Sequence, residues 1–506
     1  MPMRGSPRTF PSGVETSPLY VNRLRLRTRS ARACQLTAIA AVAVAFAAAA
    51  STAGAVNVNV VRQGEAPKNP PANNFYYKTI QAAVNASKSG DWVLIEPGKY
   101  DEEVRVTSAQ EGIKIRGLDR NAVIIDGQHK PKPEGSNGIE IFKTSNVSVE
   151  NLTVRNFDRA SLNGENGNEI WWNGGDGSGV IGAHGWTGRF LTAYDDGLNG
   201  GYGIFTSNEM NGSWENIYAS GFNDAGMYIG ACRECEARVN KAVMENSALG
   251  YSGSNSGGKL IIEHSVFRNN SAGIAPNSEN PSDPPPPQDG ACNSGSNTSP
   301  TPTFTTTRIE RCTRFQNNVV ESNNNLTTPA NESAARAPWG VGVELPGTYA
   351  DLSESNTIKG NANVGVLGFE FPNPFEPPLF EHTIFFQLAG NKIQGNQFSG
   401  NGTGGGAFAG DVTLEGGLFG QKESTNNCLS ENHFSAATHP AKIEKTWGCQ
   451  NKTTPNPEEF GAIEYVLELQ AQSQARTSVG QPVPPAQKTM PTPCAGVPNN
   501  PLPCQP

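Results

Sequence analysis

The chain has little positive charge. Its 506 residues include 39 Lys and Arg against 47 Asp and Glu, a net charge of −8. Without residues 1–55, whose single acidic side chain is Glu15, 32 basic and 46 acidic side chains remain, and the net charge is −14. Such a surface repels nucleic acid and anionic lipid. We therefore expect no nucleic-acid partner, and a polyanionic sugar would need a basic cleft or a bridging cation.

Long apolar runs are missing outside the N-terminal region. A basic leader from Arg23 to Arg32 precedes an Ala- and Val-rich run from Leu36 to Ala50, and Ala53-Gly54-Ala55 has the small side chains of a cleavage site. Residues 1–55 are therefore predicted to be a signal peptide of a secreted, extracellular or cell-envelope protein with no membrane insertion after cleavage. The alternative is an uncleaved anchor, although the run is short and Ala-rich for a spanning helix.

The cysteines lack the partners of a metal site. Cys232 and Cys235 form a lone CxxC with no second pair or nearby His, which favours a local or inter-coil disulfide over free thiols or a metal. Excluding Cys34 in the signal peptide, an even number of cysteines remains, as expected for an exported protein with disulfides. The disulfide candidates are Cys232, Cys235, Cys292, Cys312, Cys428, Cys449, Cys494 and Cys504.

A Gly-apolar pair returns every 23 to 24 residues in the middle of the chain. The pairs are Gly203-Ile204, Gly226-Met227, Gly250-Tyr251 and Gly273-Ile274. A period of this length indicates one unit stacked on copies of itself, and the Gly, Asn, Val, Ile and Thr of the units favour short strands and tight turns over helices. Each unit is therefore predicted to be one coil of an all-β solenoid, a single-stranded parallel β-helix.

Asn residues recur beside the apolar positions of these units. Stacked Asn side chains hydrogen-bond along a solenoid axis and tolerate the left-handed backbone that a corner needs. We expect stacking of Asn151 with Asn216 and Asn240, and of Asn356 with Asn396 and Asn432. Apolar neighbours such as Leu152 and Phe398 would fill the interior.

A second pattern precedes the repeats. The segment TIQAAV at 79–84 predicts an amphipathic helix, and DWVLIEPGKY at 91–100 predicts a buried strand and a turn. This order, followed by VRV and IKIRG, resembles the N-terminal capping helix and first coil of right-handed parallel β-helix proteins of the pectin lyase-like superfamily. The resemblance implies a right-handed solenoid and a carbohydrate partner, and its motifs specify the fold far better than the chemistry.

The domain organisation follows from these patterns. Residues 56–74 are predicted to be a linker and 75–469 the β-helix. Residues 276–306, rich in Pro, Ser, Asn and Thr, are predicted to be a disordered insertion, and 470–506 a disordered tail rich in Pro and Gln. We expect a monomer.

Candidate site residues lie at equivalent turns of neighbouring units. Asp195 and Asp196 precede the coil that begins at Gly201, and Asp224 precedes the next one, so their carboxylates could bind Ca²⁺ or supply an acid and a base. The alternative is that each Asp only caps its turn. The irregular segment 168–194 adds Trp171, Trp172 and Arg189, which suit stacking on a sugar and neutralising a uronate, although Trp also fills irregular cores.

The chain has no intact catalytic signature of the polysaccharide lyases, polygalacturonases, pectin methylesterases or uronan epimerases of this superfamily. Whether it is an enzyme is therefore open; if it is one, a polysaccharide lyase, hydrolase or epimerase is expected. The favoured hypothesis is a secreted protein that binds or processes a polysaccharide or cell-envelope glycan, with Ca²⁺ as the candidate cofactor. The alternative is a non-catalytic structural or interaction protein of the cell envelope or extracellular space.

Overall fold

The computed structural model describes residues 55–160, 166–175, 180–232, 234–278, 312–332, 334–372, 385–386, 388–415, 426–450 and 462–505. The predicted signal peptide lies outside these residues apart from Ala55. The predicted insertion also lies outside them apart from residues 276–278, of which the first two end a strand. No helix in these ranges has the length and apolar character needed to span a bilayer.

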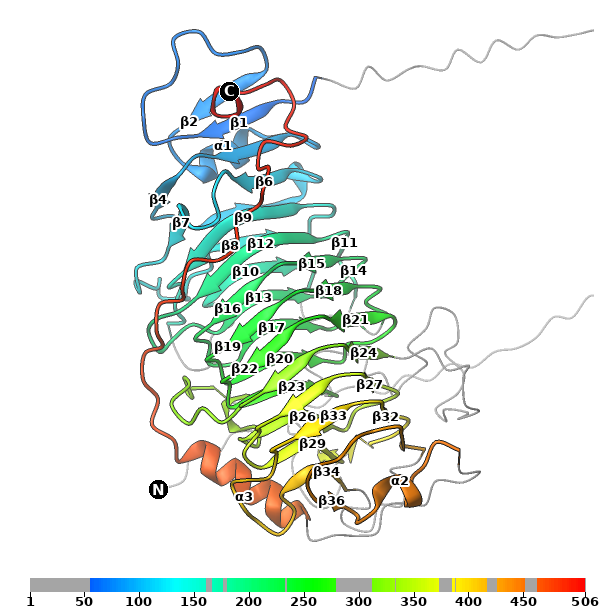
Figure 1. Ribbon diagram of the computed structural model, residues 1–506. Helices are drawn as coiled ribbons and strands as arrows, with labels where there is room; N and C mark the ends of the chain where they lie inside the picture. Colours follow the sequence, from blue (N-terminus) through cyan, green and yellow to red (C-terminus); the bar gives the residue numbers. More distant parts are fainter. Residues whose placement is uncertain are drawn as a thin grey trace, which may run out of the picture. The chain divides into compact units, whose positions relative to one another are not determined.

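The repeats form three faces of stacked parallel strands, and each coil visits the faces in the same order (Figure 1). The first face holds, in spatial order, β2 (Asn74–Tyr77), β1 (Val58–Val61), β3 (Trp92–Ile95), β6 (Lys114–Gly117), the first halves of β9 (Ser148–Arg155) and β12 (Thr187–Tyr194), β15 (Ser213–Glu215), β18 (Arg238–Asn240), β21 (Leu260–Glu263), β24 (Thr313–Gln316), β27 (Leu352–Glu354), β32 (Lys392–Gln394) and β35 (Cys428–Ser430). The second face holds β4 (Gly98–Tyr100), β7 (Val123–Asp126), the second halves of β9 and β12, β16 (Tyr218–Ser220), β19 (Val243–Glu245), β22 (Val266–Arg268), β25 (Val319–Glu321), β28 (Thr357–Lys359) and β33 (Gln397–Ser399).

The third face is an 11-stranded sheet. It runs through β5 (Val104–Val106), β8 (Ile139–Phe142), β10 (Asn168–Asn173), β13 (Tyr202–Ser207), β17 (Ala225–Gly230), β20 (Leu249–Ser254), β23 (Ala272–Asn277), β26 (Val341–Pro346), β29 (Val364–Phe369), β34 (Gly410–Leu414) and β36 (Thr438–His439). Outside the faces, β11 (Ala183–His184) pairs in parallel with β14 (Glu209–Met210), and β30 (Phe371–Pro372) pairs antiparallel with β31 (Phe385–Phe386). The chain is therefore a right-handed parallel β-helix, and the predicted resemblance is confirmed at the level of the fold.

Helices lie at several points along the chain. They are α1 (Ile80–Ala86), α2 (Ile443–Thr446), α3 (Ala462–Gln474) and the short 3₁₀ turns η1 (Ser108–Gln110), η3 (Ala334–Arg336) and η5 (Leu502–Cys504). Thr79 starts α1 by accepting a hydrogen bond from the Ala82 N–H, and the apolar side of the helix, with Ile80 and Val84, packs into the interior cluster. Near the C-terminal end of the solenoid, Ile443 of α2 joins the same cluster.

The Gly of the repeat is required by the close approach of neighbouring coils. A Cβ on Gly203 would lie 2.5 Å from the carbonyl oxygen of Gly226, and one on Gly250 would lie 2.5 Å from that of Gly273. The residues after these glycines point inward and stack, with Ile204 in register with Met227. The repeat predicted from the sequence is thus one turn of the solenoid.

Asn side chains stack along the second half of the solenoid, as predicted. Asn356 Nδ2 donates to Asn396 Oδ1 at 3.0 Å, and Asn396 Nδ2 donates to Asn432 Oδ1 at 3.0 Å. Glu444 ends this row by accepting hydrogen bonds from Asn432. The predicted register of Asn216 with Asn240 is wrong by one residue, because Asn240 pairs with Glu215.

The reason for this error is that the corner requires a left-handed backbone, which several residue types supply. The equivalent positions on successive coils are Asn216 (φ 55°), Lys241 (φ 60°) and His264 (φ 50°). Aligning the coils by their Asn residues therefore placed Asn240 at the corner, where the structure has Lys241.

We expect the Asn356→Ala substitution to lower the free energy of unfolding by about 3 kcal/mol. It removes the donor to Phe315 O and the acceptor of the Asn318 N–H, and each buried group left without a partner costs about 1–3 kcal/mol. Gln397→Ala, at an exposed position of the next coil, is the control and should change stability by less than about 0.5 kcal/mol. Urea-induced unfolding measures the stability of both variants. Equal losses would contradict a structural role for the stacked side chains of Asn356, Asn396 and Asn432.

The structure corrects the predicted linker at 56–74. Residues Val58–Val61 form β1, which pairs with β2 on one side and β3 on the other. Val58, Val60 and Val61 are fully buried. The prolines that suggested a linker follow this strand and lie only in the connection to β2.

The structure also differs from the disordered tail predicted at 470–506. After α3, residues 475–505 run back along the coils to the N-terminal strands (Figure 1). The Val479 N–H donates to Thr327 O at 3.1 Å, and the Met490 N–H donates to Asn151 Oδ1 at 2.8 Å. These partners lie far away in the sequence, so a local pattern of Pro and Gln could not reveal them.

Candidate functional site

A tight turn after β7 presents an imidazole at the corner between the second and third faces. Asp126 Oδ1 accepts the Gln128 N–H at 2.8 Å, and Gln128 and His129 both have a left-handed backbone. A Cβ on Gly127 would lie 2.3 Å from the Asn156 carbonyl oxygen, so only Gly fits between these coils. Two consecutive left-handed non-Gly residues are costly, and such strain is typical of functional sites.

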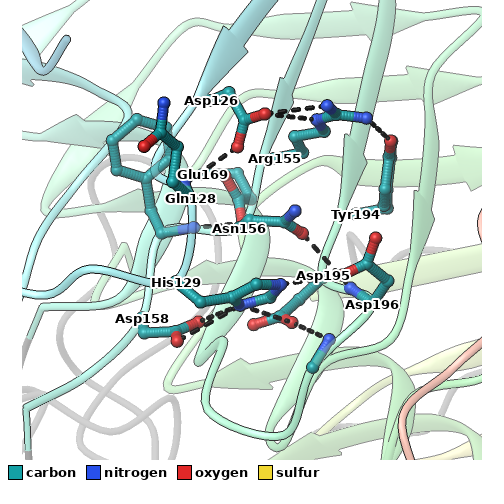
Figure 2. A network of polar contacts seen from close by, with 12 residues as sticks. Asp126, Gln128, His129, Arg155, Asn156, Asp158, Glu169, Tyr194, Asp195 and Asp196 are labelled. Carbon is teal, nitrogen blue, oxygen red and sulfur yellow. Dashed lines mark hydrogen bonds and ion pairs between the residues drawn. The ribbon is translucent and has the colours of Figure 1, made fainter. Parts of the chain in front are cut away.

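Turns of the next two coils bring carboxylates to both nitrogens of His129 (Figure 2). His129 Nδ1 lies 3.2 Å from Asp158 Oδ1 and 3.8 Å from Asp195 Oδ1, and His129 Nε2 lies 2.7 Å from Asp196 Oδ1. We call residues 126–129, 156–158 and 194–197 the His129 corner. The side chains of His129 and Asp196 are 34% and 30% exposed, whereas those of Asp158 and Asp195 are 5% and 0% exposed. A sugar in solvent could therefore contact only His129 and Asp196 of these four.

Buried acids lie behind the exposed pair. Burial, followed by the charge and the hydrogen bond of Asp158, raises the pKa of Asp195 to about 8, although the Gly197 N–H and His129 oppose the shift. Burial, followed by the charge of Asp195, raises the pKa of Glu169 well above its usual value. Glu169 Oε1 accepts the Phe157 N–H at 3.1 Å, and its Oε2 has no hydrogen-bond partner among the described residues. The acidic side chains at the His129 corner therefore outnumber the basic side chains that could neutralise them.

The imidazole partly compensates this charge. Burial lowers the pKa of His129, but its hydrogen bonds to Asp196 and Asp158 and the charge of Asp195 outweigh burial and raise the pKa above its usual value. Beside it, Arg155 Nη2 lies 2.7 Å from Asp126 Oδ2, and the same guanidinium donates to the Tyr194 hydroxyl. Arg155 therefore fixes the strand ends from which the turns of the corner begin.

The arrangement permits two kinds of chemistry. His129 and Asp196 form an exposed acid–base pair whose ring is oriented from behind by Asp158 and Asp195. Alternatively, His129, Asp158 and Asp195 offer ligand atoms that all lie within 4.8 Å of one another and could hold a metal ion.

The predicted site residues do not all meet. Asp195 and Asp196 lie at the His129 corner, but Asp224 instead accepts a hydrogen bond from the Tyr202 hydroxyl at 2.7 Å. Arg189 is held on the first face by Glu150 Oε1, with its Nε at 2.9 Å. The ligand-type side chains that lie together are instead those of His129, Asp158 and Asp195.

The two tryptophans of the predicted site face opposite sides of β10. Trp172 is fully buried in the interior, where its ring packs near Trp186 and Trp214, so it cannot contact a polysaccharide on the outer surface. Trp171 stacks on Phe205 with ring centroids 4.9 Å apart and is only 9% exposed. Consecutive strand residues alternate between faces, which explains why both could not serve one site.

His129 and Asp158 were not predicted, although the sequence contains a signal for them. Asp126, Arg155 and Tyr194 are in register at the ends of three successive second-face strands. His129 and Asp158 each follow their register residue by three positions. The Gly repeat that defined the coils begins later, at Gly203, so these earlier turns were not aligned.

The disulfides join neighbours in the sequence. The bonded pairs are Cys232–Cys235, Cys428–Cys449 and Cys494–Cys504. Cys312 is also disulfide-bonded, and Cys292 lies outside the described residues. Cys232 and Cys235 are bonded to each other, in agreement with the local disulfide predicted for the CxxC.

A family model described as a protein of unknown function, DUF1565, matches residues 330–459. No curated protein matches significantly.

Solved structures are similar at low identity. The A-module of the mannuronan C-5 epimerase AlgE4 of Azotobacter vinelandii has 16% identity and a TM-score of 0.41, with 70% of this chain and 89% of that chain covered. An alginate lyase from Paenibacillus sp. str. FPU-7 has 10% identity and a TM-score of 0.37, with 72% and 93% covered. Pectate lyase Pel9A has 13% identity and a TM-score of 0.34, with 62% and 74% covered. Similarities of this size carry no argument about activity.

Proposed function

We propose that the mature chain is a secreted β-helix protein that binds a polysaccharide across the His129 corner and processes it by acid–base chemistry at His129 and Asp196. One observation carries this proposal: a partly exposed imidazole is oriented at both nitrogens by carboxylates from two further coils. A surface His that served only solubility would not need a strained turn and three acidic neighbours to fix its ring.

The roles of the four side chains follow from their exposure. His129 and Asp196 would contact the sugar, because both reach solvent. Asp158 and Asp195 are positioning residues, because they lie behind the ring and fix its orientation without reaching the surface. A ring fixed in advance loses little freedom when a substrate binds, which is a large part of what a rigid site contributes to catalysis.

The solenoid suits a polymeric substrate. Equivalent positions on successive coils lie about 4.8 Å apart, so turns from neighbouring coils line a continuous surface along which sugar units can bind. The mature charge of −14 disfavours a polyanion unless a cation or the His129 imidazolium offsets it locally. A neutral glycan and a cation-bridged uronan are therefore the two substrate classes to compare.

The experiment uses the disulfide-bonded chain from residue 56 onward and a panel of mannuronan, alginate, pectate, pectin and α-1,3-glucan. New reducing ends, absorbance of unsaturated uronates near 235 nm and proton NMR separate hydrolysis, elimination and epimerisation. We expect turnover of at least one polymer. Binding without turnover, or no interaction with any polymer, would refute acid–base processing and favour the non-catalytic structural alternative.

A further inference from the structure

The strongest unassigned feature is the set of donor atoms around His129 Nδ1. Nδ1 lies 3.2 and 3.3 Å from the two oxygens of Asp158 and 3.8 Å from Asp195 Oδ1. Around one ion with bonds of about 2.1 Å, neighbouring ligand atoms lie roughly 3.0–3.4 Å apart. The spacing around Nδ1 is therefore close to that of one coordination sphere.

A second observation points to a ligand at this position. Asp195 is 1% exposed; its Oδ1 accepts the Gly197 N–H, its Oδ2 has no N–H or hydroxyl donor among the described residues, and its hydrogen bond with Asp158 joins two carboxyl groups. Its carboxyl group lies beneath the His129 ring, on the side of Asp158 (Figure 2). Two buried carboxyl groups that face each other need either a shared proton or a shared cation, because both cannot remain charged and unpaired.

The other nitrogen of the ring has the environment expected of a metal-binding His. Nε2 lies 2.7 Å from Asp196 Oδ1, a closer contact than any that Nδ1 makes. A ligating His commonly donates its second N–H to a carboxylate, which fixes the tautomer and orients the other nitrogen toward the metal. Asp196 would hold the proton on Nε2 and leave Nδ1 free as a ligand.

We propose that His129 Nδ1, Asp158 and Asp195 bind a divalent first-row transition-metal ion, with Asp196 as the orienting carboxylate. The imidazole distinguishes this site from a calcium site, because Ca²⁺ takes oxygen ligands, whereas Zn²⁺ and similar ions take imidazole nitrogen together with carboxylate. Three protein ligands leave a coordination position open, as in catalytic rather than structural zinc sites. With Nδ1 on an ion, the exposed Nε2–H and Asp196 would remain the pair that exchanges a proton with the sugar, so this inference deepens the proposed function, on which its biological meaning rests.

The test is metal binding by the mature chain, purified without a His tag, freed of metal with EDTA and desalted. Calorimetric titration with ZnCl₂ should show one ion per chain with at least micromolar affinity. His129→Gln and Asp158→Asn should each weaken binding about 100-fold or more, and Asp196→Asn about tenfold. His264→Gln is the matched control, because this ring is 54% exposed and lies beside Asn240 and Glu263 on another corner. It should bind zinc as the wild-type chain does.

Thermal unfolding with and without ZnCl₂ shows whether each variant folds. His129 and Asp196 are partly exposed, so at least these two variants should fold and give a reading. Binding of Ca²⁺ alone, no Zn²⁺ binding, or zinc binding that His129→Gln leaves unchanged would overturn the metal site. The titration contains no glycan, so metal binding without glycan turnover would refute only the proposed function, and turnover by metal-free protein would refute only a role of the ion in the reaction.

Discussion

His129→Gln should lower polysaccharide turnover by about 10²–10⁴-fold, the contribution expected of a positioned acid or base. Gln keeps a polar side chain of similar reach but can neither gain nor lose a proton near neutral pH. His129 makes its contacts through both ring nitrogens, and its side chain is 34% exposed, so the loss should come from chemistry rather than from unfolding.

The positioning residues should behave differently from His129. Asp158→Asn removes a buried charge beside Nδ1 but leaves a hydrogen-bonding side chain, so we expect a smaller loss of kcat and a shifted pH profile. His264→Gln again serves as the control. Wild-type turnover in His129→Gln, together with unchanged substrate affinity, would exclude this corner as the reaction site.

The chain should be more stable at pH 5 than at pH 8, with a difference of several degrees in Tm when measured in EDTA. Burial raises the pKa of Glu344 and of Glu209 well above 4.5, the usual value, and raises that of Glu332 to about 8. The folded chain then keeps protons that the unfolded chain releases above about pH 4.5. The stabilisation is therefore fully present below that pH and is lost as the pH rises through the folded-state pKa values.

Glu344→Gln isolates one of these groups. Glu344 is 2% exposed in β26, and its Oε1 has no hydrogen-bond partner among the described residues. Because Gln cannot ionise, the variant should match the wild-type chain at pH 5 and exceed it in Tm at pH 8. Glu468→Gln, on the exposed side of α3, should follow the wild-type chain at both pH values. A Glu344→Gln variant that is equally destabilised at pH 5 and pH 8 would contradict the assignment.

The fold could be predicted because its requirements are local and repeated. Gly occurs at equivalent positions such as 203 and 250, where a neighbouring carbonyl oxygen leaves no room for a Cβ. An apolar side chain such as that of Ile204 follows, because this position faces the interior. The helix Ile80–Ala86 could also be predicted, because the capping Thr79 and the apolar spacing that follows it are visible in a short stretch of sequence.

The candidate site was only half predictable, because it depends on how turns of unequal length stack. Asp195 and Asp196 stand out in the sequence, but His129 reaches them from 66 and 67 residues away. Trp172 matched the composition of a sugar site, yet strand alternation turns it inward. The tail was missed for a similar reason, since Met490 finds its partner, Asn151, 339 residues earlier.

A crystal structure of the mature chain with an oligosaccharide of the polymer that it processes would test the His129 corner most directly. We expect a sugar unit in contact with His129 and Asp196, with neighbouring units bound along adjacent turns between the second and third faces. An ordered oligosaccharide on another face, with none at the His129 corner, would contradict this expectation.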